Sequence, residues 1–187
     1  METSGKFLER LQQQRLLIQQ DPAAAYHLAN EIIIPHVDFE RTSRWVLGKH
    51  WRNASVQQRQ QFTQEFSSML THTYVTAMVQ YVDTILANGE NVEFPPLDLK
   101  PEAKEATVMM LIRMPEGRVP VSFDLHRTGS IWKIYDVSID GISLATTYRG
   151  SFANQIRRRG LDDLITAMHK KNTGHPGNTI IKASITQ

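Results

Sequence analysis

The stretch that decides the fold is "IWKIYDVSIDGISLATTYRG", residues 131–150. It begins as a half-buried strand, because Tyr135, Val137 and Ile139 recur at every second position and so share one face. The Asp-Gly dipeptide at 140–141 then predicts a tight turn, since both residue types tolerate a positive φ. The chain becomes apolar again directly after this turn, which predicts that the apolar face of the strand continues beyond it.

Two earlier segments alternate in the same way and extend this strand into a sheet. They are "TVMMLIRM" at 107–114 and "PVSFDLHR" at 120–127, and the strand at 131–139 follows them. The links at 115–117 and 128–130 are rich in turn residues and short enough only for antiparallel hairpins. A proline-rich stretch before the first strand forms a loop or a weak edge strand, which brings the expected number of strands to about four.

The chain before the strands carries the signals of several helices. Leucines at helical spacing predict a first helix over residues 5–20. Asp21 can cap a second helix, with Pro22 at its first position, where proline loses no hydrogen bond. Asp38 can cap a third helix, and "SVQQ" at 55–58 is a capping box that begins a long fourth one.

The long helix carries a wide apolar stripe over residues 62–85, and two further amphipathic helices follow the strands. Helices combined with antiparallel hairpins indicate the α+β class. The expected fold is a strongly twisted antiparallel sheet of about four strands wrapped by several helices. A filled core and an internal cavity both agree with this pattern. Residues 1–171 are expected to form a single domain, and residues 172–187 a flexible C-terminal tail.

The composition argues against several classes of function. Apolar residues make up 41% of the 187 residues, which is typical of a globular domain. Lys and Arg total 21 against 19 Asp and Glu, a balance that argues against a nucleic-acid-binding protein. The chain has no cysteine, which excludes disulfides, thiolate metal sites and a cysteine nucleophile. Its longest apolar runs, such as "VMMLI" at 108–112, are too short to span a membrane.

An enzyme is the alternative that the residues leave open. Ser143, in "GISLA", resembles half of a nucleophile elbow, and Asp162 and His169 follow it in the order of a hydrolase triad. That elbow belongs to parallel sheets, however, and these hairpins are antiparallel, so a turn serine is the better interpretation. An inward carboxylate, Asp124 or Asp136, is the other candidate, but both alternate with the apolar residues of their strands. We therefore expect no catalysis.

Histidines and one basic cluster are the remaining polar candidates. The histidines have no spacing typical of a metal site, so no metal is expected. Arg157, Arg158 and Arg159 end a helix, where cations interact favourably with the helix dipole. They form either a solvated helix end or a docking patch for a partner. The histidines are at positions 27, 36, 50, 72, 126, 169 and 175.

Two longer segments carry motifs in a defined order. The first is "IIIPHVDFERTSRWVLGKHWRNASVQQRQQFTQEFSSMLTHTYVTAMVQY", residues 32–81, with a proline-ended helix, V-L-G-x-x-W and A-S-x-x-Q-R. The second is "WKIYDVSIDGISLATTYRGSFANQIRRRGLDDLITAM", residues 132–168. Together they closely resemble the signature of the MlaC, or toluene-tolerance, family. The resemblance covers about residues 5–171, and the strands at 107–127 match mainly in pattern.

The resemblance implies a function that the composition does not. Members of this family are periplasmic carriers that shuttle glycerophospholipids between the outer-membrane and inner-membrane complexes of the Mla pathway, which maintains the lipid asymmetry of the outer membrane. The implied partners are phospholipid, an inner-membrane ABC transporter complex and an outer-membrane lipoprotein–porin complex. The resemblance implies no cofactor, only bound phospholipid as cargo. It also implies that a secretion signal has been removed from this chain.

The resemblance further implies an apolar cavity between the twisted sheet and the helices, which holds the acyl chains. Tyr74 and Ile142 match the family motifs at positions that line this cavity, and Leu144 points to it from beyond the turn. Strand alternation and helical phase supply the other candidates, and ordinary core is an equally good interpretation of each. These are Phe66, Leu70 and Met78 on the long helix, and Met110, Val121, Phe123, Val137 and Ile139 on the strands.

Overall fold

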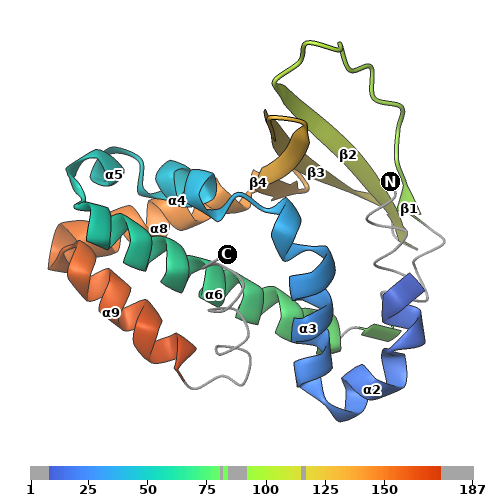
Figure 1. The fold of residues 1–187 in the computed structure, drawn as a ribbon, viewed down its shortest axis with the longest axis horizontal. Coiled ribbons are helices and arrows are strands. Elements are labelled where there is room, and N and C mark those ends of the chain that lie inside the picture. Colours follow the sequence, from blue (N-terminus) through green and yellow to red (C-terminus); the bar gives the residue numbers. More distant parts are fainter. Residues whose placement is uncertain (1–8, 81, 84–91, 115–116, 174–187) are drawn as a thin grey trace.

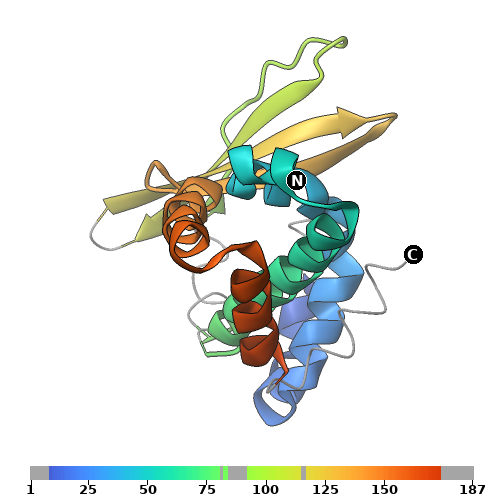
Figure 2. The same cartoon turned by 90° about the vertical axis from the view of Figure 1, so that its left-hand side faces the viewer.

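The computed structural model describes residues 9–80, 82–83, 92–114 and 117–173. An open antiparallel sheet lies on one side of a group of packed helices (Figures 1 and 2), so the fold is α+β, as predicted. The strands are β1 (Val92–Glu93), β2 (Glu105–Met114), β3 (Gly117–Thr128), β4 (Ile131–Ile139) and β5 (Ile142–Ser143). The helices with defined bounds are α2 (Arg15–Gln20), α3 (Pro22–Ile32), η1 (Ile34–His36), α4 (Phe39–Leu47), α5 (Lys49–Asn53), α6 (Val56–Gln80), α8 (Leu144–Arg159) and α9 (Leu161–Asn172).

Side-chain caps determine where three of the predicted helices begin. The Asp21 carboxylate accepts a hydrogen bond from the Ala23 amide at 2.9 Å and so caps α3. Asp38 caps α4 in the same way, through an amide of the first turn at 2.8 Å. Ahead of α6, the Ser55 amide donates to the Gln58 side chain at 2.9 Å, and the Gln58 amide donates to the Ser55 hydroxyl at 3.1 Å. All three predicted caps are confirmed.

The first predicted helix, over residues 5–20, differs in part from the structure. Residues 9–13 are helical, but Gln14 leaves the helix, with φ −100° and ψ 8°, before α2 begins. Residues 1–8 lie outside the described part of the chain. A second interruption separates α4 from α5 at Gly48, whose φ of +54° is a conformation that glycine adopts at little cost.

The five strands pair in chain order, and every pair is antiparallel. The three predicted strands are confirmed as β2, β3 and β4. The expected sheet of about four strands agrees with the structure, in which the two-residue strands β1 and β5 complete the sheet at its edges. Asp140 and Gly141, between β4 and β5, have φ values of +51° and +77°. Both values are positive, as a type I′ hairpin requires, so the predicted turn is confirmed.

A β-bulge interrupts the pairing of β3 with β4. Asp124 pairs with Asp136, but the next residue of β3, Leu125, pairs with Ile134. Tyr135 is therefore an extra residue on β4 that has no partner on β3. Because side chains alternate with a period of two, this extra residue shifts the alternation of the strand at that point.

The bulge places Tyr135 on the face opposite to Val137 and Ile139. Its ring lies against His126, with ring centroids 5.9 Å apart, and the Arg41 guanidinium lies 4.5 Å from its centroid. His126 occupies the even-numbered face of β3, whereas the partners of Val137 and Ile139 are odd-numbered. The prediction that all three residues share one face was therefore wrong for Tyr135, because the extra residue reverses the alternation.

The long helix α6 lies at the centre of the hydrophobic core. The rings of Phe62 and Phe66 stack with centroids 5.5 Å apart, and Phe152 of α8 packs edge-on against both. Leu164 and Met168 of α9 complete this cluster. A second cluster joins residues of α2 and α3 to the C-terminal half of α6. The predicted apolar stripe of the long helix thus supports two packed clusters.

The last described helix extends past the predicted domain boundary at residue 171. Asn172 is buried, and its side-chain amide donates to the buried Glu65 carboxylate at 2.7 Å. Nδ1 of His169 lies 2.8 Å from the other oxygen of the same carboxylate. Asn172 therefore belongs to α9 and not to the tail, of which residues 174–187 lie outside the described chain. Within the described ranges, no helix is long and apolar enough to cross a membrane.

Candidate functional site

The side chains of four strands form a continuous apolar surface. Residues paired directly across antiparallel strands point to the same face of a sheet. The register aligns apolar residues of β2, β3 and β4, and the turn at 140–141 continues the row onto β5. Phe123, for example, pairs with Val108 on one side and with Val137 on the other. We call this surface the apolar sheet face; its residues are Val108, Met110, Ile112, Val119, Val121, Phe123, Val137, Ile139 and Ile142.

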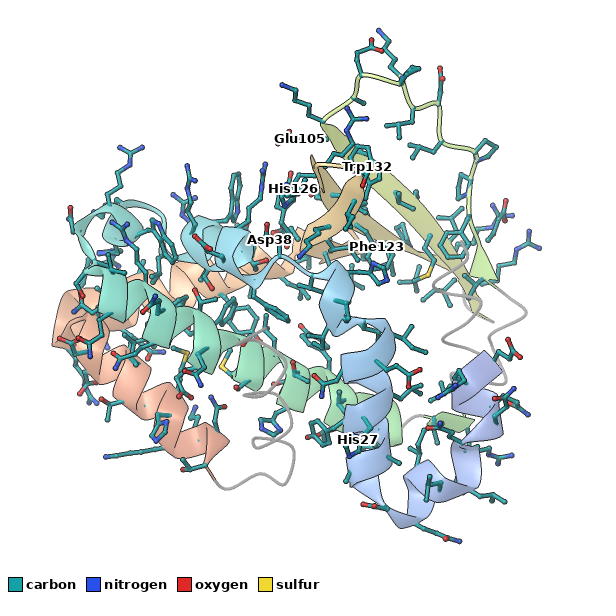
Figure 3. The ribbon with its side chains drawn as sticks, in the orientation of Figure 1. His27, Asp38, Glu105, Phe123, His126 and Trp132 are labelled. Atoms are coloured by element: carbon teal, nitrogen blue, oxygen red, sulfur yellow. The ribbon has the colours of Figure 1, made fainter. Side chains whose placement is uncertain are left out.

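The apolar sheet face is only partly covered by the rest of the protein. Val121 is buried, most of the other residues are half-buried, and Ile142 is 66% exposed. Figure 3 shows Phe123 on the side of the sheet that faces α3 and α6, whereas His126 lies next to Asp38 at the start of α4. A contiguous apolar surface that stays partly exposed is typical of a binding site.

The strand residues predicted as a site lie together on this face. Leu144 lies beyond it, half-buried at the first position of α8. The alternation pattern could identify the others because the bulge lies before Asp136, so the residues after it keep a regular register with β3. The predicted residues on the apolar sheet face are Met110, Val121, Phe123, Val137, Ile139 and Ile142.

The residues predicted on the long helix have different environments. Tyr74 is partly exposed, and burial together with the charge and hydrogen bond of Tyr148 raises the pKa of its phenol to about 12. The phenol is therefore neutral at physiological pH. Leu70 is half-buried against the helical core. Phe66 is 0% exposed inside that core, so it is ordinary packing in this structure. The side chain of Met78 lies outside the described residues.

Ser143 has the geometry of a helix cap. Its hydroxyl accepts a hydrogen bond from the Thr146 amide at 3.0 Å, which caps α8. The same hydroxyl donates to the Asp136 carboxylate at 2.5 Å, and that carboxylate also accepts from the Ala145 amide at 3.1 Å. Ser143 and Asp136 together thus hold the start of α8 against the end of β4.

The other members of a possible triad are engaged elsewhere. Asp162 accepts a hydrogen bond from Nε2 of the Gln58 side chain at 2.8 Å, and His169 contacts Glu65. Asp124 accepts from the Thr107 hydroxyl at 2.7 Å, on the face of the sheet opposite to the apolar one. Among the residues that the structure describes, no group of three or more His, Asp or Glu is placed to hold a metal ion.

The cap geometry predicts the outcome of Ser143→Ala. Loss of the hydroxyl removes the cap of α8, so the free energy of unfolding should fall by about 1 kcal/mol. Binding of an apolar ligand to the apolar sheet face should not change, because the hydroxyl contacts the Thr146 amide and the Asp136 carboxylate. Urea denaturation and extraction of bound ligand measure the two effects. A hydrolase that depends on this serine would show the same loss of stability but would also lose turnover of added ester substrates.

A polar junction joins the sheet to α4 on the face opposite to the apolar one. Nε2 of His126 lies 2.7 Å from a carboxylate oxygen of Asp38, and the Arg41 guanidinium lies 2.5 Å from the Glu105 carboxylate. The Tyr135 ring lies between these two pairs. No local pattern in the sequence predicts this junction, because its partners are 88 and 64 residues apart.

A family model, two relatives and one solved structure are similar to this chain over most of its length. A family model described as "MlaC protein" matches residues 1–170. The toluene tolerance protein ttg2D of Pseudomonas putida is 28% identical over 162 residues, which cover 86% of this chain and 72% of that protein. The intermembrane phospholipid transport system binding protein MlaC of Haemophilus influenzae is 21% identical over 174 residues, which cover 90% of this chain and 78% of that protein. A solved phospholipid-binding protein from Ralstonia solanacearum, in complex with a phospholipid, is similar with a TM-score of 0.76 and 26% identity, covering 92% of this chain and 94% of that one.

Proposed function

The chain belongs to the MlaC family, and from this premise we propose that it is a phospholipid carrier that works without catalysis. One observation carries the proposal. The Ralstonia solanacearum protein of the same fold is in complex with a phospholipid, and this chain covers nearly all of that structure. The apolar sheet face of this chain supports the proposal, because it offers apolar surface that the protein itself leaves partly exposed. The chain from residue 1 to the end of α9 would act as one carrier domain.

The acyl chains are proposed to lie against the apolar sheet face, on the side of α3 and α6. Leu70 and Tyr74 would approach them from α6, on which Met78 stays a candidate from the sequence alone, and Leu144 would border the site at the start of α8. Phe66 would support these residues from within the core without touching lipid. Each methylene removed from water contributes ~0.8 kcal/mol, so two chains of roughly 30 methylenes gain on the order of 20 kcal/mol gross. Release into water is therefore negligible.

The carrier is proposed to act in the periplasm between two membrane assemblies. These are an outer-membrane lipoprotein–porin complex and an inner-membrane ABC transporter complex, and their joint effect would be to maintain outer-membrane lipid asymmetry. The name of the Haemophilus influenzae relative, an intermembrane phospholipid transport system binding protein, supports this role. A bilayer shelters acyl chains about as well as an apolar site does, so the partners would determine the direction of transfer.

Organic extraction of the purified protein tests the proposal. We expect close to one glycerophospholipid per protein, with mixed headgroups, because an apolar surface discriminates poorly among polar groups that stay in solvent. Mass spectrometry of the extract, with protein quantified by absorbance, gives the ratio. Recovery of only detergent, or of no lipid, from protein purified without detergent contradicts the carrier function and favours a scaffold whose core is filled.

A further inference from the structure

A concave surface borders the face of the sheet opposite to the apolar sheet face. It is a groove of about 790 Å³ between α4, α5, the start of α8 and His126 of β3. His126 and Phe123 lie on opposite faces of β3, so this groove does not open onto the apolar sheet face. We call it the basic groove; the residues that characterise it are Arg41, Arg44, Trp45, Lys49, Arg52 and Arg149.

Positive charge is concentrated in the basic groove. Five of its lining residues are Lys or Arg and two, Asp38 and Glu40, are acidic, whereas the whole chain has a net charge of only +2. Asp38 is already engaged, because it caps α4 and contacts His126. Of the basic residues, Arg41 pairs with Glu105 outside the groove. No other described carboxylate lies within ion-pair distance of the remaining four.

Two features characterise the lining of the groove. The Arg149 guanidinium packs against the backbone of Gly48, where a Cβ atom would lie 2.9 Å from it. Trp45 leaves 49% of its surface exposed at the rim, between cationic neighbours.

We propose that the basic groove docks an acidic segment of a partner protein, with an apolar side chain of that segment against Trp45. Arg and Trp are the residue types that most often dominate the binding energy of protein interfaces. Uncompensated positive charge favours a segment rich in Asp and Glu. The concave shape fits a protruding segment better than a flat bilayer. The proposal depends on the proposed carrier function in one respect. That function identifies the partners to be tested, which are the outer-membrane and inner-membrane complexes.

Reversal of charge at Arg44 and Arg52 tests the proposal. Both side chains are exposed, so the Arg44→Glu/Arg52→Glu variant should fold normally by circular dichroism and thermal melting. We expect its dissociation constant for one of the two complexes to rise roughly tenfold or more. Added salt should weaken binding of the unmodified protein much more than that of the variant. Biolayer interferometry with each purified complex, at low and high salt, measures both effects.

The matched control makes the same change of charge elsewhere. Lys170→Glu/Lys171→Glu alters two exposed residues at the end of α9, on the opposite side of the helical layer from α4 and α5 (Figures 1 and 2). Its affinity should stay within about twofold of the unmodified value, a difference well below 1 kcal/mol. Trp45→Ala is a second variant, which keeps every charge; it should weaken binding but leave the salt dependence unchanged.

The remaining outcomes each decide the proposal. Equal affinity of the unmodified protein and Arg44→Glu/Arg52→Glu for both complexes overturns it. Loss of binding only to phosphatidylglycerol vesicles, with the complexes unaffected, also overturns it and assigns the groove to a membrane surface. A protein that carries lipid but binds neither complex overturns the docking inference alone. A protein that binds a complex through the groove but carries no lipid overturns the carrier function and leaves the docking inference in place.

Discussion

Replacement of Ile142 by aspartate should leave the protein folded and lower its co-purified phospholipid by about tenfold or more. Ile142 is 66% exposed on β5, so in the lipid-free protein the new carboxylate has access to water and little stability is lost. Acyl chains lying on the apolar sheet face would remove that water, and burial of an unpaired charge costs several kcal/mol. Since 1.4 kcal/mol changes an equilibrium tenfold, retention of lipid should fail.

The sheet provides a control for this variant. Ile131 is the same residue type, 54% exposed and on the same sheet, but it pairs with Thr128 on the face opposite to the apolar one. Ile131→Asp should therefore keep the full lipid load. Lipid phosphorus per mole of protein and a thermal melt measure the two variants together. If Ile142→Asp retains as much lipid as Ile131→Asp, the apolar sheet face does not hold the acyl chains.

Truncation of two phenylalanines should separate core from site. Phe66 is fully buried among aromatic rings, so Phe66→Ala should lower the free energy of unfolding by about 3–5 kcal/mol. Phe123 is half-buried on the apolar sheet face, and Phe123→Ala should cost only about 1 kcal/mol in the lipid-free protein. Phe123→Ala should, however, carry markedly less phospholipid, because acyl chains lose the largest side chain of that face.

Urea denaturation of delipidated protein gives the two free energies by linear extrapolation. Delipidation is essential, because a ligand that binds only the folded state adds its own stabilisation. Equal losses of stability in the two variants would mean that Phe123 is core and that no accessible surface exists around it. The lipid content of Phe66→Ala is informative only if a substantial fraction remains folded, which the melt establishes.

Local signals were sufficient to predict much of the fold. The caps at Asp21, Asp38 and Ser55 satisfy amides within three residues of themselves, so their effect could be read from a few neighbouring positions. The turn at 140–141 is equally local, because its two residues alone determine the positive φ values. Alternation along β3 and the end of β4 identified the apolar sheet face, since register there is regular.

Features that depend on distant segments could not be predicted in this way. "KIYDV" alternates as any strand does, and the extra residue at Tyr135 is visible only in the pairing with β3. Phe66 and Leu70 share one helical stripe, and only the packing of α8 and α9 distinguishes the buried core position from the less buried one. The basic groove joins four separate elements, so none of its residues stands out in its own segment.

The bulge at Tyr135 limits how this protein can diverge over evolutionary time. The Asp38 amide donates to the Ile134 carbonyl, which fixes the first half of β4 to the helices. Deletion of Tyr135 would remove the bulge and restore regular alternation, while Val137 and Ile139 would keep their partners Phe123 and Val121 on the apolar sheet face. Such a deletion would cost the contacts of Tyr135 with His126 and Arg41. Deletion of Ser138 has no extra residue to absorb it and would turn Ile139 to the polar face. Descendants of this gene are therefore expected to vary in length within this strand only at the bulge, and to keep the length of residues 137–139 fixed.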